Sequence, residues 1–341
     1  MATDTITIYD IAAQAKVSIA TVSRAFNDSP RVSPKTRDRI FAVAKDLGYH
    51  PNSLARNLAR QQSSLVSAVI PMMTSYFYLE VLQGVQSHIA ASEYDLLVYS
   101  APQLEDVEGL LESALTRGKS AGVLLFSTPM EASRVALLKS REQPVILVDQ
   151  HHPDFDSVSI DNEEGGALAT EHLLNQGYRR IAMIMANTDS VPAMKRAEGF
   201  RMAHRAANIE IDESLVVGSH DPAFHGYTEE AGYKAMVHLL KHPSRPEAVF
   251  ATSDIQALGA KRAIEDAGLE VGKDIGLIGF DDIMISRYVG LSTLRQPMFD
   301  IGARAADLLL QRIEKPDAPV SHTVYSSALV ARTSSNKCQG S

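Results

Sequence analysis

Short apolar runs alternate with helix-like segments from Leu65 onward, and this alternation limits the possible folds more than any other feature. The runs are LVSAVIP, YDLLVYS, AGVLLFS, PVILVDQ, RIAMIMA, AVFAT and DIGLIGFDD. The segments between them fit helices at 79–91, 105–117, 163–176, 193–207, 227–241 and 254–267. Buried strands separated by helices are typical of parallel sheets with helices on both faces. The pattern therefore predicts an α/β body of doubly wound parallel sheets.

The residues before this body show a helical period instead. Apolar side chains recur at i, i+3, i+4 and i+7 from Ile8, which predicts a first short helix capped by Thr7. Ser18 and Ser33 stand where the N-caps of a second and a third helix are expected, and Gly48 ends the third. Two short helices joined by a tight turn and followed by a third are typical of a helix-turn-helix.

The second helix of such a motif enters the major groove of DNA with its N-terminal residues at the base edges. Its outward side chains here are small or polar, and Arg24 can donate two hydrogen bonds to guanine. Periodicity alone leaves a plain helical bundle with a polar face as the alternative. The DNA-contacting residues predicted in this region are Ser18, Ile19, Ala20, Thr21, Ser23, Arg24 and Asn27.

The net charge also differs between the residues before Leu65 and those after it. Residues 1–64 contain nine basic and five acidic side chains, a net charge of +4, so −12 falls on the rest of a chain whose total is −8. A basic head on an acidic body indicates a nucleic-acid partner for the head. No apolar run reaches membrane-spanning length, the N-terminus has no signal-peptide pattern, and the one cysteine, Cys338, has no partner for an internal disulfide. We therefore expect a cytoplasmic protein with no membrane contact.

Polar and aromatic residues follow the predicted strands of the body. Because ligands of such folds bind at the carboxyl ends of the strands, we expect these residues to line a cleft. Carboxylates and amides pair with hydroxyl groups, and an aromatic face suits a sugar ring. Taken singly, each residue could equally be a helix cap. The residues predicted on this basis are Ser75, Phe77, Tyr78, Asp149, Asn187, Asp254 and Asp281.

The head resembles the DNA-binding domain of the lactose-repressor family. The matching positions are YDIA, VS-x-x-TVSR-x-x-N, VS-x-x-T-x-x-x-I and LGY-x-PN, although Lys16 stands where the family usually has glycine. The resemblance implies a hinge after Pro51 that orders on operator DNA. In that hinge Leu58 would wedge into the minor groove, and Asn52 and Ala55 would also contact the DNA.

The body also resembles this family, through IDNEEGGALATEHLLNQGYRRIAMI, RAEGFRMAH, TSDIQALGAKRAIEDAGLEVGKDIGLIGFDD and LSTLRQP. The resemblance implies that Arg196 clamps a small effector and that Asp281 accepts hydrogen bonds from it. Tyr227 would stack on the effector, and Asp149 would line the pocket in a sugar-responsive protein. Phe77 and Tyr78 would line the amino-terminal lobe.

The predicted fold class is an N-terminal all-α helix-turn-helix DNA-binding head plus an α/β periplasmic-binding-protein-like body of two doubly wound parallel-sheet lobes. The family pattern divides the chain into a head (1–50), a hinge helix or linker (51–64), lobe one (65–161 and 293–321), lobe two (162–292 and 322–334) and a tail (335–341). The implied function is transcriptional regulation, as a repressor of sugar-utilisation genes, by a homodimer on a near-palindromic operator in double-stranded DNA. A sugar-like effector would change operator affinity allosterically.

Three alternatives belong beside this prediction. A purine or nucleoside could replace the sugar, although Ser190 stands where the purine-responsive relative has arginine. A stand-alone sugar-binding protein would share the body but would have no helix-turn-helix. An enzyme is disfavoured, since the chain shows no P-loop, nucleophile elbow, HExxH or cysteine-rich zinc motif. We therefore expect no catalytic residues, no cofactor and no metal, and we expect His151 and His152 to be loop residues at the rim of the cleft.

Overall fold

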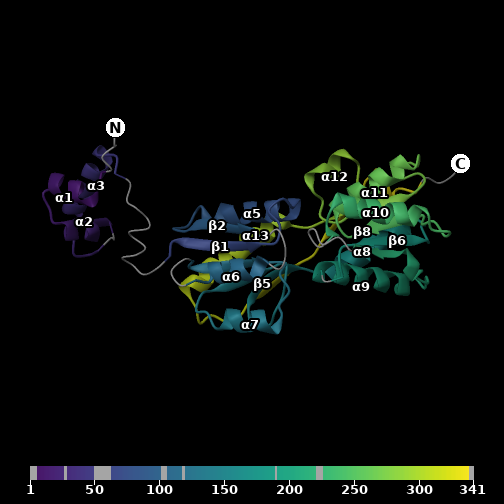
Figure 1. Ribbon diagram of the computed structural model, residues 1–341, viewed down its shortest axis with the longest axis horizontal. Coiled ribbons are helices and arrows are strands. Elements are labelled where there is room, and N and C mark those ends of the chain that lie inside the picture. The colour runs from purple at the N-terminus through teal and green to yellow at the C-terminus, as the bar shows by residue number, and fades with distance from the viewer. Residues whose placement is uncertain are drawn as a thin grey trace. The chain divides into compact units, whose positions relative to one another are not determined.

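The computed structural model divides into two compact units, Met1–Ser64 and Leu65–Ser341. It describes residues 6–26, 29–49, 63–100, 106–116, 120–188, 190–219 and 226–337. Four of the predicted DNA-contacting residues, namely Asn27, Asn52, Ala55 and Leu58, lie outside these ranges. Within them, no helix is both long and apolar enough to cross a membrane. Figure 1 shows the elements of both units.

The head consists of α1 (Ile8–Gln14), α2 (Ile19–Phe26) and α3 (Pro34–Asp46), as the helical period predicts. Thr7 begins α1 through its backbone N–H and hydroxyl, which both donate to Asp10 Oδ2 at 2.7 Å. Ser33 caps α3 by accepting from the Thr36 N–H at 3.3 Å. The three helices enclose one small core, made of Ile11, Ala12, Ala15, Val22, Ala25, Val32, Ile40 and Ala44.

Lys16 in the turn between α1 and α2 has a φ of +52°, in the left-handed region that L-residues avoid. We expect Lys16→Gly to stabilise the head by about 0.5–1 kcal/mol. Relief of about 1–2 kcal/mol of left-handed strain is partly offset by the greater freedom of glycine in the unfolded chain. Native-state hydrogen exchange at α1 and α3 amides would measure the change. Ala13→Gly, in the exposed interior of α1, is the matched control and should lower stability by about 1 kcal/mol. If hydrogen exchange in Lys16→Gly is no slower than in the parent protein, the strain argument is contradicted.

The first lobe of the body is built on a six-stranded parallel sheet in the order β11-β5-β4-β3-β1-β2. Its strands are β1 (Leu65–Ile70), β2 (Asp95–Ser100), β3 (Gly122–Phe126), β4 (Val145–Val148), β5 (Asp156–Ile160) and β11 (His322–Tyr325). One face packs against α5 (Tyr76–Ile89) and α13 (Met298–Glu314). The other packs against α6 (Val107–Ala114) and α7 (Ala132–Lys139).

The second lobe is built on a four-stranded parallel sheet in the order β7-β6-β8-β9. Its strands are β6 (Ile181–Met185), β7 (Val216–Gly218), β8 (Ala248–Ala251) and β9 (Gly276–Ile278). Helices α8 (Asn162–Asn175) and α9 (Val191–Ala206) cover one face. Helices α10 (Glu229–Leu240) and α11 (Asp254–Asp266) cover the other. The shorter elements are η2 (Glu213–Leu215), α12 (Met284–Tyr288) and η4 (Thr333–Ser335).

The chain crosses between the lobes at three places. The first crossing joins β5 to α8, and the other two run through β10 (Thr293–Arg295) and β12 (Ala328–Val330), which pair antiparallel. Strand β11 pairs with β5, so residues 322–325 belong to the first lobe. The sequence-based boundary after residue 321 was therefore wrong for these four residues, because an exposed edge strand leaves little hydrophobic pattern to detect.

Three helix pairs of the body cross at reciprocal glycines. A Cβ atom on either glycine of a pair would lie far inside van der Waals distance of a backbone carbonyl oxygen of the other helix. Each pair can therefore approach this closely only with glycine at both positions. The pairs are Gly84 and Gly302 (α5 and α13), Gly166 and Gly199 (α8 and α9), and Gly232 and Gly259 (α10 and α11).

Candidate effector and DNA-contacting sites

Four residues just beyond the carboxyl ends of strands have left-handed backbone conformations. They are Ser127 after β3 (φ +42°), Asp149 after β4 (φ +56°), and Asp281 and Asp282 after β9 (φ +127° and +59°). Such conformations cost free energy in non-glycine residues and persist where the surrounding structure imposes them. They gather at the strand ends, where the sequence predicts the effector site.

Asp149 is half-buried, and its two carboxylate oxygens differ. Oδ2 accepts from the Ser127 hydroxyl at 2.7 Å, whereas Oδ1 has no hydrogen-bond partner among the described residues. Burial raises the pKa of Asp149, opposed by the Ser127 hydrogen bond and by the charge of Arg196. Burial, followed by the charge of Asp149, raises the pKa of Tyr78, while the same Ser127 hydroxyl lowers it. Tyr78, Ser127 and Asp149 therefore form one group in the first lobe.

Arg196 of α9 is the buried cation of the second lobe, with 4% of its surface exposed. Nε donates to Asn162 Oδ1 at 2.8 Å, and Nη1 donates to the Thr252 carbonyl at 2.6 Å. The guanidinium carbon lies 3.7 Å from the centre of the Phe280 ring, a cation–π arrangement. This cation affects the pKa of Asp149, Tyr227 and Asp281, so side chains of both lobes share one electrostatic environment.

Asp281 is buried beside Arg196, and its Oδ1 accepts from Gln296 Nε2 at 2.6 Å. Burial raises the pKa of Asp281 to about 8, although Arg196 opposes the shift. Gln296 Oε1 is buried and has no partner among the described residues. Sequence reasoning missed Gln296. The only signal was its place in LSTLRQP, directly after a predicted crossing between the lobes.

Tyr227 lies near this group, and its hydroxyl is 2.9 Å from the Ser190 hydroxyl. Its pKa is raised by burial and further by Asp149 and Asp281, while Arg196 and Ser190 lower it. Asn187 follows β6, and a Cβ atom on the adjacent Gly226 would lie 2.7 Å from Asn187 Oδ1. The structure thus brings together Tyr78, Asp149, Asn187, Arg196, Tyr227 and Asp281 from the predicted set.

Asp254 requires a correction, because its carboxylate is fully engaged within the protein. Oδ1 accepts from the Thr293 hydroxyl at 2.6 Å, and Oδ2 accepts from the Ser286 hydroxyl at 2.6 Å and the Ile283 N–H at 3.0 Å. Its exposed fraction is 0%. Asp254 therefore tethers α12 and β10 to α11 and offers no atom to an effector.

Ser75 and Phe77 are also predicted site residues. Among the described contacts, neither shares a hydrogen bond with Asp149, Arg196 or Asp281. Ser75 is the half-buried N-cap of α5. The Phe77 ring packs against the Tyr78 ring in a T-shape, with 5.2 Å between centroids. Phe77 thus reaches the group only through Tyr78.

The predicted DNA-contacting face of the head is open to solvent. Ile19, Ala20 and Arg24 are exposed, and Thr21 and Ser23 are half-buried on the same helix. Ser18 is exposed and caps α2, since its Oγ accepts from the Thr21 N–H at 3.1 Å. The buried side of α2 holds Val22 and Ala25, so the predicted DNA-contacting residues lie on its outer side.

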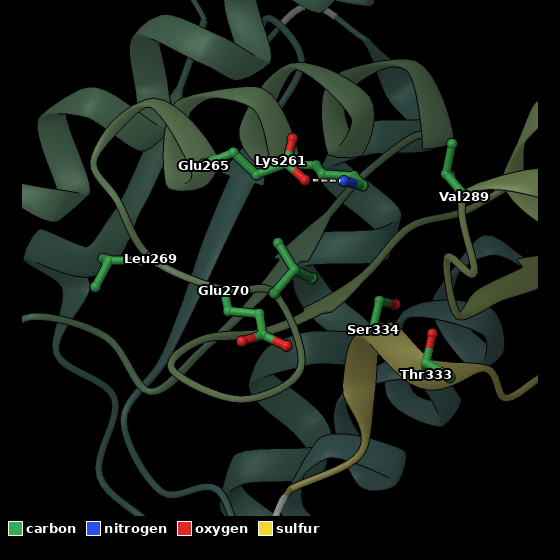
Figure 2. A pocket seen from close by; sticks show the side chains of 8 residues that line it. Lys261, Glu265, Leu269, Glu270, Val289, Thr333 and Ser334 are labelled. Carbon is green, nitrogen blue, oxygen red and sulfur yellow. Dashed lines mark hydrogen bonds and ion pairs between the residues drawn. The ribbon is translucent and has the colours of Figure 1, made fainter.

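Two other features lie apart from these groups. A pocket of about 190 Å³ lies in the second lobe beside α11 and η4, and Figure 2 shows Lys261 paired with Glu265 in its wall. None of the predicted effector residues lines it. The ring centroids of His151 and His322 lie 4.5 Å apart. Among the described residues, no cluster of three or more histidine, cysteine or acidic groups could hold a metal.

Comparisons with known proteins agree with both units. The model of the lacI family of bacterial regulatory proteins matches residues 7–52, and that of a periplasmic binding protein-like domain matches residues 170–335. The catabolite control protein A of Priestia megaterium is 31% identical over 315 residues, covering 91% of this chain and 93% of that protein. The ribose operon repressor of Escherichia coli K12 is 34% identical, also over 315 residues, covering 91% and 94%. The lac repressor dimer bound to operator and the anti-inducer ONPF has a TM-score of 0.84 at 26% identity, covering 97% of this chain and 99% of that chain.

A helix-turn-helix head followed by a two-lobed binding-protein-like body defines a DNA-binding transcriptional regulator. The chain belongs to the lacI family of bacterial regulatory proteins. The predicted fold class and family are thereby confirmed. The relatives are transcriptional regulators and not enzymes.

Proposed function

We propose that this protein represses genes of sugar use in the cytoplasm, as a homodimer on a near-palindromic operator, and that a sugar-like effector controls its operator affinity. Ile19, Ala20 and Arg24 would contact base edges from the exposed face of α2. Ser18, Thr21 and Ser23 would hold phosphates or bases. Asn27, Asn52, Ala55 and Leu58 remain proposed contacts on the strength of the family resemblance. We assign the protein no enzymatic activity.

The effector proposal rests on two buried side-chain oxygens that lack hydrogen-bond partners among the described residues, in the group of residues around Arg196. These oxygens are Asp149 Oδ1 and Gln296 Oε1. A buried polar atom without a partner costs free energy, so such atoms indicate a missing ligand group. Both are oxygens that accept hydrogen bonds, and the hydroxyl groups of a sugar would donate to them. The ribose operon repressor among the relatives agrees with this ligand class.

Thermal-shift screening tests the proposal directly. The panel contains D-ribose, other pentoses and hexoses, sugar phosphates and nucleosides, added to the full-length protein. A sugar at about 100 times its Kd should stabilise the folded protein by about 2.7 kcal/mol through mass action. Arg196→Ala and Asp281→Ala should abolish the rise in melting temperature. Arg262→Ala, whose side chain is 72% exposed, is the matched control and should preserve it.

Operator binding completes the test. Duplexes selected by the full-length protein from random DNA should be near-palindromic, and the stabilising sugar should change the affinity for them. If only nucleosides stabilise the protein, the proposed effector class changes from sugar to nucleoside, and the proposal that the protein is a DNA-binding regulator is unaffected. A response to no compound of the panel would remove the effector proposal.

A further inference from the structure

Asn162 stands at the first crossing between the lobes and contacts the buried arginine. It is the first residue of α8 and follows β5 of the first lobe by two positions. Its Oδ1 accepts from Arg196 Nε at 2.8 Å, and its Nδ2 donates to the carbonyl of Ile160, the last residue of β5, at 3.4 Å. One buried amide therefore bonds to the cation of the second lobe and to a strand of the first.

The second crossing repeats this arrangement with the opposite charge. Gln296 lies between β10 and α13, and its Nε2 donates to Asp281 Oδ1 at 2.6 Å. Its backbone N–H also donates to the Asp281 carbonyl, at 3.3 Å. The two charged residues most central to the proposed effector site, Arg196 and Asp281, are thus each held by an amide side chain at a crossing.

The glycine contact between α8 and α9 explains how Asn162 reaches Arg196. Gly166 lies against the backbone of Arg196, so the two helix backbones are in close contact at this arginine. Asn162 precedes Gly166 by one helical turn and occupies the same face of α8. With Nε held by Asn162 and Nη1 by the Thr252 carbonyl, Nη2 has no hydrogen-bond partner among the described residues. Nη2 is then the atom left for a ligand.

We propose that Asn162 is a positioning residue that holds the Arg196 guanidinium against the first crossing, so that the arginine and the crossing move together. This inference rests on the proposed function for its biological meaning, since a ligand that draws on Arg196 would then act on the orientation of the lobes. These hydrogen bonds lie entirely within the protein. They can therefore be tested without an effector.

The test uses full-length ligand-free protein labelled with ¹⁵Nε-arginine, in which Arg196→Lys assigns the Arg196 Nε–H signal. We expect a signal protected from solvent exchange in the unsubstituted protein. Asn162→Leu, which keeps the shape and removes both hydrogen bonds, should lose it. Asn162→Asp retains the acceptor and should restore it, a rescue that a merely structural role would not produce. Asn162→Ala replaces the leucine variant if that variant does not fold.

The reciprocal measurement follows the crossing itself. The Asp161 N–H, which donates to the Tyr325 carbonyl at 2.9 Å, should exchange about fivefold faster in Arg196→Ala, as for the loss of one hydrogen bond. Arg180→Ala, an exposed position in the same lobe, is the control and should leave that rate unchanged. A protected Arg196 signal in Asn162→Leu, or an unchanged Asp161 rate in Arg196→Ala, would overturn the inference. Either result would leave the thermal-shift test of the effector unaffected.

Discussion

Arg312→Ala is expected to lower the free energy of unfolding of the body by about 3–5 kcal/mol, the usual cost of removing one partner of a buried ion pair. Arg312 of α13 donates to Asp156 from Nε at 2.7 Å and from Nη2 at 2.9 Å, and the aspartate is only 4% exposed. The same guanidinium donates to the carbonyls of Pro316, Ala318 and Pro319, which fixes the loop after α13. The substitution leaves a buried carboxylate without its cation and frees this loop.

Urea denaturation followed by circular dichroism and by tyrosine fluorescence would measure the change. Arg262→Ala breaks an exposed ion pair with Asp266 one turn along α11 and should cost no more than about 0.5 kcal/mol. Asp156 also accepts from the Ser321 N–H at 2.7 Å, so Asp156→Asn should destabilise as well. Equal effects of Arg312→Ala and Arg262→Ala would show that the Arg312 pair contributes no more than a surface pair.

Gly166→Ala should also destabilise the body, by about 1–3 kcal/mol or more, because a new methyl group must push apart two closely packed helix backbones. The displacement falls on the backbone of Arg196, so a sugar that stabilises the parent protein should bind the variant more weakly. Gly109→Ala is the matched control. Gly109 lies in α6 with nothing within 4 Å of the added Cβ atom, so alanine there should stabilise by about 0.5–1 kcal/mol.

Denaturant titration of both variants measures the difference, since the same substitution should act with opposite sign. A stabilising effect at Gly166 would mean that α8 and α9 separate easily. The close approach of these helices would then not position Arg196.

The elements that sequence could predict were those with a strong hydrophobic pattern. The three helices of the head follow from a helical period, and the buried strands β1, β3, β4, β6 and β8 follow from continuous apolar runs. Strand β11 was misplaced because it is a half-exposed edge strand, and its partner β5 lies far away in the chain. A local pattern contains no signal for a pairing across that distance.

The site was predictable where the chain order places polar residues after strands, as with Asp149 and Asp281. Asp254 looked identical in sequence, yet Ser286 and Thr293, far along the chain, occupy its carboxylate. Gln296 and Asn162 have the reverse character. Gln296 follows β10, which lies outside the two main sheets, and Asn162 follows β5, which the apolar runs did not predict. Only the crossings bring Asn162 to Arg196 and Gln296 to Asp281.

The reciprocal glycines separate the parts of this protein that can change in evolution from those that cannot. A glycine at a helix crossing can be replaced only with a compensating shift of the opposite helix, so these six positions should stay constant in any lineage that keeps the fold. Residues at the strand ends touch no such crossing and can vary as ligand preference changes. Among the residues of the proposed site, Arg196 alone also takes part in a helix crossing. Its backbone contacts Gly166, and its side chain belongs to the proposed site. A redesign for a new effector would therefore keep the backbone of α9 at this crossing and vary the side chains around it.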